Sequence, residues 1–178
     1  MRIISGKLKG RIIHPPKNLR ARPTTDFAKE SLFNVLNNLI DFEGIEVLDL
    51  FAGTGSIGYE FVSRGAAFVT CVEINAIHVN FIKSAARSLG IENMVVVRAN
   101  AFLYIKGVKK QFDVIFADAP YDIAGSETLP DMVFSHNILK QDGVFILEHS
   151  RNLHFEDHEY FSESRSYGSV QFSIFKKS

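Results

Sequence analysis

The sequence has almost no cysteine and no long apolar run. Cys71 is the single cysteine among 178 residues, so no internal disulfide can form, and we expect a reduced thiol in a buried strand. No apolar run approaches the ~20 residues that span a bilayer. The first residues, MRIISGKLKGR, lack the apolar core and the small-residue cleavage site of a signal peptide. Together these absences predict a protein of the cytoplasm.

Internal repeats, low-complexity tracts and long linkers are also missing from the sequence. Hydrophobic residues make up 46% of the chain and charged residues only 22%. A chain of this length and composition has enough apolar surface for one complete hydrophobic core. We therefore expect one folded domain.

The chain has no net charge, but its charges are unevenly distributed. Residues 1–25 hold seven of the 20 Lys and Arg residues and none of the 20 Asp and Glu residues. Residues 1–25 therefore form a basic arm, and residues 26–178 form an acidic body. This pattern is typical of proteins that hold a polyanion by one end. A pair of solvated surface strands would explain the same charges and stays open as an alternative.

Strands and helices are predicted to alternate after the arm. Apolar strands are predicted at 46–50, 68–73, 94–98, 112–117, 144–148 and 170–175, and helices at 27–40, 56–64, 76–89, 101–106 and 127–140. Thr25 or Asp26 is the expected cap of the first helix, and Asn75 that of the helix with Ile77, Phe81, Ala85 and Leu89 as its buried face. This alternation predicts a parallel sheet covered on both sides, with ligands beyond the carboxyl ends of its strands.

A glycine-rich loop follows the first strand, in the stretch VLDLFAGTGSIGYEF. Its Gly53-x-Gly55-x-x-Gly58 spacing fits a dinucleotide-binding turn, but many strand-to-helix turns share that spacing. Asp49 lies four residues before Gly53, where a carboxylate would repel a pyrophosphate and attract an ammonium group. We therefore expect S-adenosylmethionine, which has an α-ammonium and no phosphate, rather than NAD.

Two further strand ends carry groups that suit an adenosine. Glu73 follows Gly53 by 20 residues, where an acid can accept hydrogen bonds from both ribose hydroxyls. Asn100 and Ala101 follow the third strand, where a side-chain amide and a backbone amide can meet the adenine edge. The alternatives are that Glu73 is a solvated acid at a strand end and that Asn100 is a helix cap.

The fourth strand ends in Asp118-Ala119-Pro120-Tyr121, which resembles the Asp/Asn-Pro-Pro-Tyr/Phe motif of amino-methyltransferases. In this interpretation the Asp118 carboxylate and the Ala119 carbonyl accept the two N–H bonds of a planar amine and direct its lone pair at the methyl group. Tyr121 would stack on the extracted base. Ala119 replaces the first proline of the motif, but a backbone carbonyl can still fill that role, and Pro120 favours an extended conformation there.

The arm and the motifs together resemble the RsmD family, bacterial enzymes that methylate the 2-amino group of a guanine in 16S ribosomal RNA. The resemblance is carried by MRIISGKLKGRII, RPTTDFAKESLFNVL, LDLFAGTGSIGYEFVSRGA, VEIN, NAF and DAPY. It implies a Rossmann-like S-adenosylmethionine-dependent methyltransferase fold, an α/β fold whose mostly parallel seven-stranded sheet has an antiparallel last strand beside the fifth. It also implies that RPTTD closes over the cofactor, although Phe27 stands where the family often has arginine.

The expected site follows from the motifs and the resemblance taken together. The expected cofactor-binding residues are Thr24, Thr25, Asp49, Phe51, Ala52, Gly53, Gly55, Glu73, Ile74, Asn100, Ala101 and Asp118, and the expected catalytic residues are Asp118, Ala119, Pro120 and Tyr121. The expected RNA-phosphate contacts are Arg2, Lys7, Lys9, Arg11, Arg20 and Arg22. His154 and His158 have metal-like spacing but lie in a predicted loop, so we expect no metal.

The expected partner is 16S ribosomal RNA, either naked or within a partly assembled small subunit, bound by a monomer. Two other functions stay open. One is a DNA adenine or protein glutamine methyltransferase, because the DAPY motif suits several planar amines. The other is a non-catalytic RNA-binding ribosome assembly factor, to which the departures at Ala119 and Phe27 point.

Overall fold

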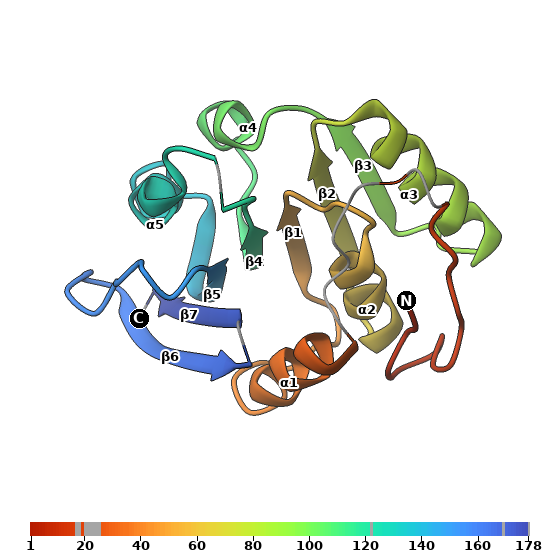
Figure 1. Ribbon diagram of the computed structural model, residues 1–178, viewed down its shortest axis with the longest axis horizontal. Coiled ribbons are helices and arrows are strands. Elements are labelled where there is room, and N and C mark those ends of the chain that lie inside the picture. Colours follow the sequence, from red (N-terminus) through yellow and green to blue (C-terminus); the bar gives the residue numbers. More distant parts are fainter. Residues whose placement is uncertain (17–18, 20–25, 122, 169, 178) are drawn as a thin grey trace.

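A computed structural model describes residues 1–16, 19, 26–121, 123–168 and 170–177 (Figure 1). Its helices are α1 (Asp26–Leu36), α2 (Ser56–Arg64), α3 (Ala76–Ser88), α4 (Ala101–Gly107), the short 3-10 helix η1 (Ser126–Thr128) and α5 (Leu129–Ser135). Its strands are β1 (Glu46–Leu50), β2 (Phe68–Glu73), β3 (Met94–Arg98), β4 (Phe112–Asp118), β5 (Leu139–His149), β6 (Phe161–Tyr167) and β7 (Val170–Lys176).

The strands form one seven-stranded sheet in the order β3-β2-β1-β4-β5-β7-β6. Strands β1 to β5 pair in parallel, and β7 lies antiparallel between β5 and β6. The predicted α/β fold, with a mostly parallel sheet and its last strand antiparallel beside the fifth, is confirmed. Strand order reverses between β1 and β4, so the ligand-binding crevice is expected at the carboxyl ends of these two strands.

Helices cover both faces of the sheet (Figure 1). The apolar cluster on one face contains residues of α1, α2 and α3, and the cluster on the other face contains residues of α4 and α5. In β1, Val47 belongs to the first cluster and Leu48 to the second, because successive side chains of a strand point to opposite faces. Both faces are therefore buried, as continuous apolar strands require.

Two predicted helices end earlier in the structure. Helix α1 ends at Leu36 rather than at residue 40, and α5 ends at Ser135, so β5 begins at Leu139 instead of residue 144. The end of α5 has a local cause, because Asn137 adopts a left-handed conformation with φ 52°. Asparagine tolerates that conformation and commonly terminates helices there.

The predicted buried face of α3 was also displaced. Val79, Ile82 and Ala86 are the buried residues of this helix, while Ile77 is 56% exposed. Phe81, Ala85 and Leu89 flank the core and are only partly buried. The helix carries apolar residues in two adjacent rows, so spacing alone did not distinguish them.

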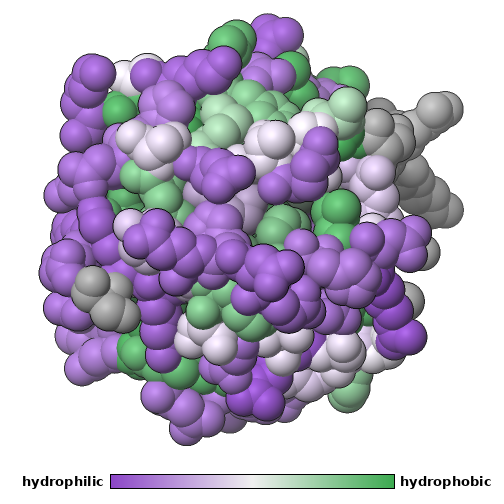
Figure 2. Space-filling view, turned by 90° about the vertical axis from the view of Figure 1, so that its left-hand side faces the viewer, coloured by the Kyte–Doolittle hydropathy of each residue, from purple (hydrophilic) through white to green (hydrophobic). Residues whose placement is uncertain are grey.

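Strand β6 was not predicted, because its sequence FSESRSY lacks an apolar run. It pairs only with β7 and forms the edge of the sheet, where charged residues discourage pairing with another chain. Figure 2 views this side of the molecule and shows hydrophilic residues over most of it, with hydrophobic residues in small separate patches. Among the described residues, no helix combines the length and apolar character needed to cross a membrane.

Candidate active site

Four neighbouring strands each bring one acid to the carboxyl edge of the sheet. These acids are Glu73 of β2, Asp49 of β1, Asp118 of β4 and Glu148 of β5, and we call them the acidic row. Each lies two residues after a member of the apolar cluster under α1, α2 and α3, namely Cys71, Val47, Phe116 and Ile146. Residues two apart in a strand share a face, so the acidic row lies on a single face of the sheet.

The glycine loop turns sharply above β1. Phe51 and Gly53 both have left-handed backbones, with φ 60° and 55°, and a bulky residue adopts that conformation only where its surroundings impose it. The Ala52 amide donates to the Val72 carbonyl at 2.9 Å, and the Gly55 amide donates to the Ala52 carbonyl at 2.7 Å. The loop is thus fixed against the end of β2.

Gly58, the third glycine of the motif, has a packing role. A Cβ on Gly58 would lie 2.8 Å from the sulfur of Cys71, so only glycine lets α2 approach β2 this closely. Its amide donates to the Asp49 carboxylate at 3.2 Å. The third glycine therefore positions Asp49 rather than a phosphate.

Asp49 is only 1% exposed. Burial raises its pKa to about 8, with a smaller upward contribution from the charges of Asp118 and Glu73, while the hydrogen bond from Gly58 opposes the rise. A cation placed against this carboxylate would favour its ionised form. The preference of this position for a positive ligand stays a prediction.

Glu73 is held by two backbone amides rather than by solvent. Its carboxylate accepts from the Gly53 amide and from the Asn75 amide, both at 2.8 Å, and the residue is 8% exposed. The alternative of a solvated acid at a strand end is therefore wrong. His78 lies 3.7 Å from the same carboxylate, and its buried Nδ1 has no hydrogen-bond partner among the described residues.

Of the residues expected near the adenine, Asn100 serves as a helix cap, and Ala101 and Ile74 differ in their exposure. The Asn100 side chain accepts from the Leu103 amide at 3.2 Å and caps α4, as the alternative interpretation held. Ala101, at the start of α4, is buried, whereas Ile74 is 61% exposed directly after β2. Contacts of these residues with an adenine stay predictions.

The DAPY segment borders a cavity of about 280 Å³, which Ala119 and Tyr121 line together with Glu148 and His149. Ala119 is 2% exposed and Tyr121 is 54% exposed. Burial raises the pKa of Asp118, which ends β4. An acid and an accessible aromatic ring are thus brought to one end of a strand, as the motif predicts.

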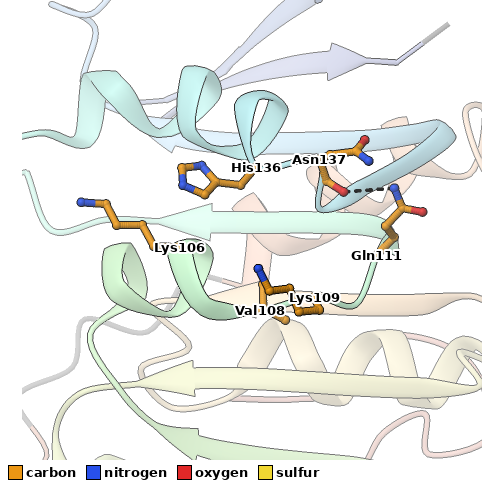
Figure 3. Close-up of a pocket in the computed structure, with 6 residues that line it drawn as sticks. All are labelled: Lys106, Val108, Lys109, Gln111, His136 and Asn137. Atoms are coloured by element: carbon orange, nitrogen blue, oxygen red, sulfur yellow. Dashed lines mark hydrogen bonds between the residues drawn. The ribbon is translucent and has the colours of Figure 1, made fainter.

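A larger cavity of about 370 Å³ lies at the opposite edge of the sheet (Figure 3). Its lining residues lie at the end of α4, between α4 and β4, or directly after α5. Gln111 donates to the Asn137 carbonyl at 3.0 Å across it. It is far from the acidic row, because Asp118 ends β4 and this cavity adjoins the beginning of that strand. Its size therefore does not make it the candidate active site.

The two histidines with metal-like spacing face different carboxylates. His154 lies 3.9 Å from Glu156, and His158 lies 3.4 Å from Asp131. Both contacts lie outside the acidic row. Neither histidine is brought to the candidate active site.

The basic arm is fastened to α2 by a buried carboxylate that the sequence analysis did not single out. Glu60 is fully buried and accepts from the backbone amides of Ile4 at 2.9 Å and Ser5 at 3.0 Å. It also pairs with Lys29 at 3.5 Å and Arg64 at 3.0 Å. The one available signal was a glutamate between two aromatic residues, Tyr59 and Phe61, in α2.

Lys29 and Ser63 complete this attachment. The Lys29 ammonium donates to the Arg2 carbonyl at 2.5 Å and to the Ser56 hydroxyl at 3.2 Å. Ser63 accepts from the Leu8 amide at 2.9 Å and donates to the Ser5 carbonyl at 2.5 Å. Burial lowers the pKa of Lys29, although Glu60 and Asp26 act in the opposite direction.

The arm directs several basic side chains into solvent. Lys7, Lys9 and Arg11 are exposed, while Arg2 pairs with Asp26 at 3.8 Å. The other residues expected in the site, Thr24, Thr25, Arg20 and Arg22, lie outside the described residues. Three exposed cations therefore lie on an arm that is attached to the body, and their binding to RNA stays a prediction.

Comparisons with known proteins identify the family of this chain. The family model described as Conserved hypothetical protein 95 matches residues 1–176. Ribosomal RNA small subunit methyltransferase D of Buchnera aphidicola subsp. Baizongia pistaciae is 34% identical over 86% of this chain and 78% of its own length.

Solved structures show the same fold. A hypothetical protein of Thermus thermophilus has a TM-score of 0.86 and 25% identity, covering 98% of each chain. The 16S rRNA N2 G1207 methyltransferase (RsmC) of the same species, solved with AdoMet and guanosine, has a TM-score of 0.71 and 20% identity over 89% of this chain and 45% of that chain. With its family model, its relative and its fold in agreement, the chain belongs to the RsmD family, several of whose curated members are named ribosomal RNA small subunit methyltransferase D.

Proposed function

We propose that the protein transfers a methyl group from S-adenosylmethionine to the exocyclic 2-amino group of a guanine in 16S ribosomal RNA. The observation that carries this proposal is the acidic row, in which Asp118 directly precedes Ala119 at the border of a cavity that Glu148 and the exposed Tyr121 also line. Four acids on one face disfavour a pyrophosphate and favour a ligand that carries positive charge. S-adenosylmethionine carries two positive groups, an ammonium and a sulfonium.

The residues present fit this cofactor. Asp49 would hold the ammonium, Glu73 the ribose hydroxyls, and Ile74 and Ala101 would border the adenine. Glu73 retains acceptor capacity for this role, since each oxygen of an ionised carboxylate can accept two hydrogen bonds. When bound, the cofactor supplies a reactive methyl group on a sulfonium.

The protein's own contribution is to position the amine. Asp118 and the carbonyl of Ala119 would accept the two hydrogens of the 2-amino group, so that the nitrogen lone pair points toward the methyl group. Tyr121 would stack on the base, which must leave its helix or loop to enter the cavity. Asp118 would also favour the positive charge that develops on the nitrogen during transfer.

The arm would supply affinity for RNA rather than choice of base. Within a single domain, residues 1–25 would contact phosphates through Lys7, Lys9 and Arg11, and residues 26–178 would carry the methyltransferase site. The choice of 16S ribosomal RNA as the substrate is supported by relatives that bear the name ribosomal RNA small subunit methyltransferase D. We propose that a monomer acts in the cytoplasm, where this RNA is assembled into the small subunit.

Methyl transfer to small-subunit particles from a strain lacking the gene tests this function. The purified protein and labelled S-adenosylmethionine should produce one N2-methylguanine per particle, detected by mass spectrometry of nucleosides. Methylated adenine or methylated protein would favour the other amino-methyltransferases. Particle binding without any methyl transfer would favour an assembly factor, and calorimetry showing NAD(H) bound instead of S-adenosylmethionine would refute the cofactor.

A further inference from the structure

The proposed function leaves one member of the acidic row without a role. Glu148 is 7% exposed, and its buried Oε2 has no hydrogen-bond partner among the described residues. Leaving such an atom unsatisfied is costly. It lines the same cavity as Ala119 and Tyr121, so a ligand in that cavity is well placed to satisfy it.

The strands beside Glu148 offer it no counterion. Its register partner on β4 is Asp118 and its register partner on β7 is the buried Phe172. The backbones of neighbouring strands lie about 4.8 Å apart, and two neighbouring carboxyls on one buried face do not both ionise readily. The pair therefore keeps a proton at neutral pH, and burial together with the charge of Asp118 raises the pKa of Glu148.

A protonated carboxyl has one O–H donor and one carbonyl acceptor side by side. The edge of guanine next to the 2-amino group presents the matching pair, the O6 acceptor and the N1–H donor. With the 2-amino group on Asp118, the O6 and N1 atoms lie further along the same edge of the base. Glu148 is the acid next to Asp118 on the side of the row away from Asp49, so it would face these two atoms of a base that points its 2-amino group toward the cofactor.

We propose that Glu148 is the specificity-determining residue for the target base, its neutral carboxyl pairing with O6 and N1–H of guanine while Asp118 holds the 2-amino group. This inference rests on the proposed function for the identity of the base. It assigns separate tasks to two adjacent acids, since Asp118 positions the reacting nitrogen and Glu148 recognises the base. Inosine keeps O6 and N1–H but lacks the 2-amino group, whereas 2-aminopurine keeps the amine and lacks both O6 and the proton on N1.

The test compares these two ribonucleosides by NMR titration of the protein loaded with S-adenosylhomocysteine. The wild-type protein should bind inosine roughly 10-fold more tightly than 2-aminopurine riboside, as expected for a buried hydrogen-bonded pair against an unsatisfied one. Glu148→Ala should bring the ratio close to one. Glu148→Gln should preserve it, because an amide offers the same donor and acceptor as a neutral carboxyl.

Controls separate recognition from folding. Glu92→Ala, which removes an exposed acid before β3, should leave the ratio unchanged, and thermal unfolding should show that each variant is folded. An unchanged ratio in Glu148→Ala, an equal loss in Glu148→Gln, or a wild-type ratio near one would each overturn the inference. Methyl transfer to ribosomal particles is scored separately, so its absence in a protein that still prefers inosine would refute the proposed function and leave base recognition standing.

Discussion

Replacing Glu60 by glutamine should loosen the basic arm and destabilise the whole domain. The change removes the charge that compensates Lys29, which is only 1% exposed. It also weakens the acceptor for the backbone amides of Ile4 and Ser5, which Glu60 holds at 2.9 and 3.0 Å. The arm would then lose its attachment to α2 at Ile4 and Ser5.

The size of the effect follows from the burial of the pair. Breaking a buried ion pair by removing one partner costs about 3–5 kcal/mol, and each buried donor left unsatisfied costs about 1–3 kcal/mol. These contributions are not additive, because all of them meet at Glu60. We expect a loss of about 3–5 kcal/mol in the free energy of unfolding, which for a chain of this length lowers Tm by roughly 6–20 °C.

The loss should depend on pH in a defined direction. Burial lowers the pKa of Lys29, and Glu60 opposes that shift, so the shift grows when Glu60 is neutralised. A lysine whose pKa is lowered in the folded state binds fewer protons there than in the unfolded chain. The stability of Glu60→Gln should therefore recover as the pH rises and fall as the pH decreases.

Urea unfolding followed by circular dichroism measures these effects. Glu30→Gln, at an exposed position of α1, is the control and should stay within about 0.5 kcal/mol of the wild type. The double variant Lys29→Met/Glu60→Gln removes both charges and should recover most of the loss. A Glu60→Gln protein as stable as the control would show that the buried charge cluster does not hold the arm.

Further predictions concern the site and the arm. Asp118→Ala should lower methyl transfer by roughly 100-fold with little change in cofactor affinity by calorimetry, and near-normal turnover would contradict its positioning role. Reversing the charge of three exposed arm residues should weaken RNA binding and reduce the slope of log affinity against log salt by about 2; an unchanged slope would mean that these residues, Lys7, Lys9 and Arg11, contact no phosphates. Because the pKa of Asp49 is raised to about 8, stability of the free protein should fall as the pH rises from about 4 toward 8, and Asp49→Asn should remove this part of the dependence. Cofactor affinity should rise over the same range, since the ammonium needs the ionised carboxylate, and a flat calorimetric profile would count against that contact.

Most of the sheet could be predicted because its strands are short apolar runs bounded by turn residues. Strands β1 to β4 were placed within one residue of their observed bounds, and the alternation with helices implied their parallel pairing. Element ends were harder. The early end of α5 depends on the left-handed backbone of Asn137, and β6 is an exposed polar edge strand whose pairing with β7 comes from the fold rather than from its composition.

The site could be predicted in part, because its motifs follow strands one at a time. Asp49, Glu73 and Asp118 each stand at the end of an apolar run, so their convergence follows from a parallel sheet. Glu148 stands at a similar strand end, yet only the register between β4 and β5 shows that it is the partner of Asp118. The role of Glu60 in holding the arm could not be predicted, since the backbone amides that it binds are more than 50 residues away in the chain.

The acidic row connects the stability of the protein to its chemistry. In the free protein, burial raises the pKa values of Asp49, Asp118 and Glu148, and the charge of Asp118 adds to the rise for Asp49 and Glu148, so the fold retains protons that the unfolded chain would release. A bound cation reverses this preference most strongly for the acids nearest to it and least for the most distant one. S-adenosylmethionine at Asp49 would thus favour ionised Asp118, the form that accepts from the amine, and leave Glu148 protonated, the form that matches guanine. One ligand would in this way set two neighbouring carboxyls into the different states that their proposed roles require.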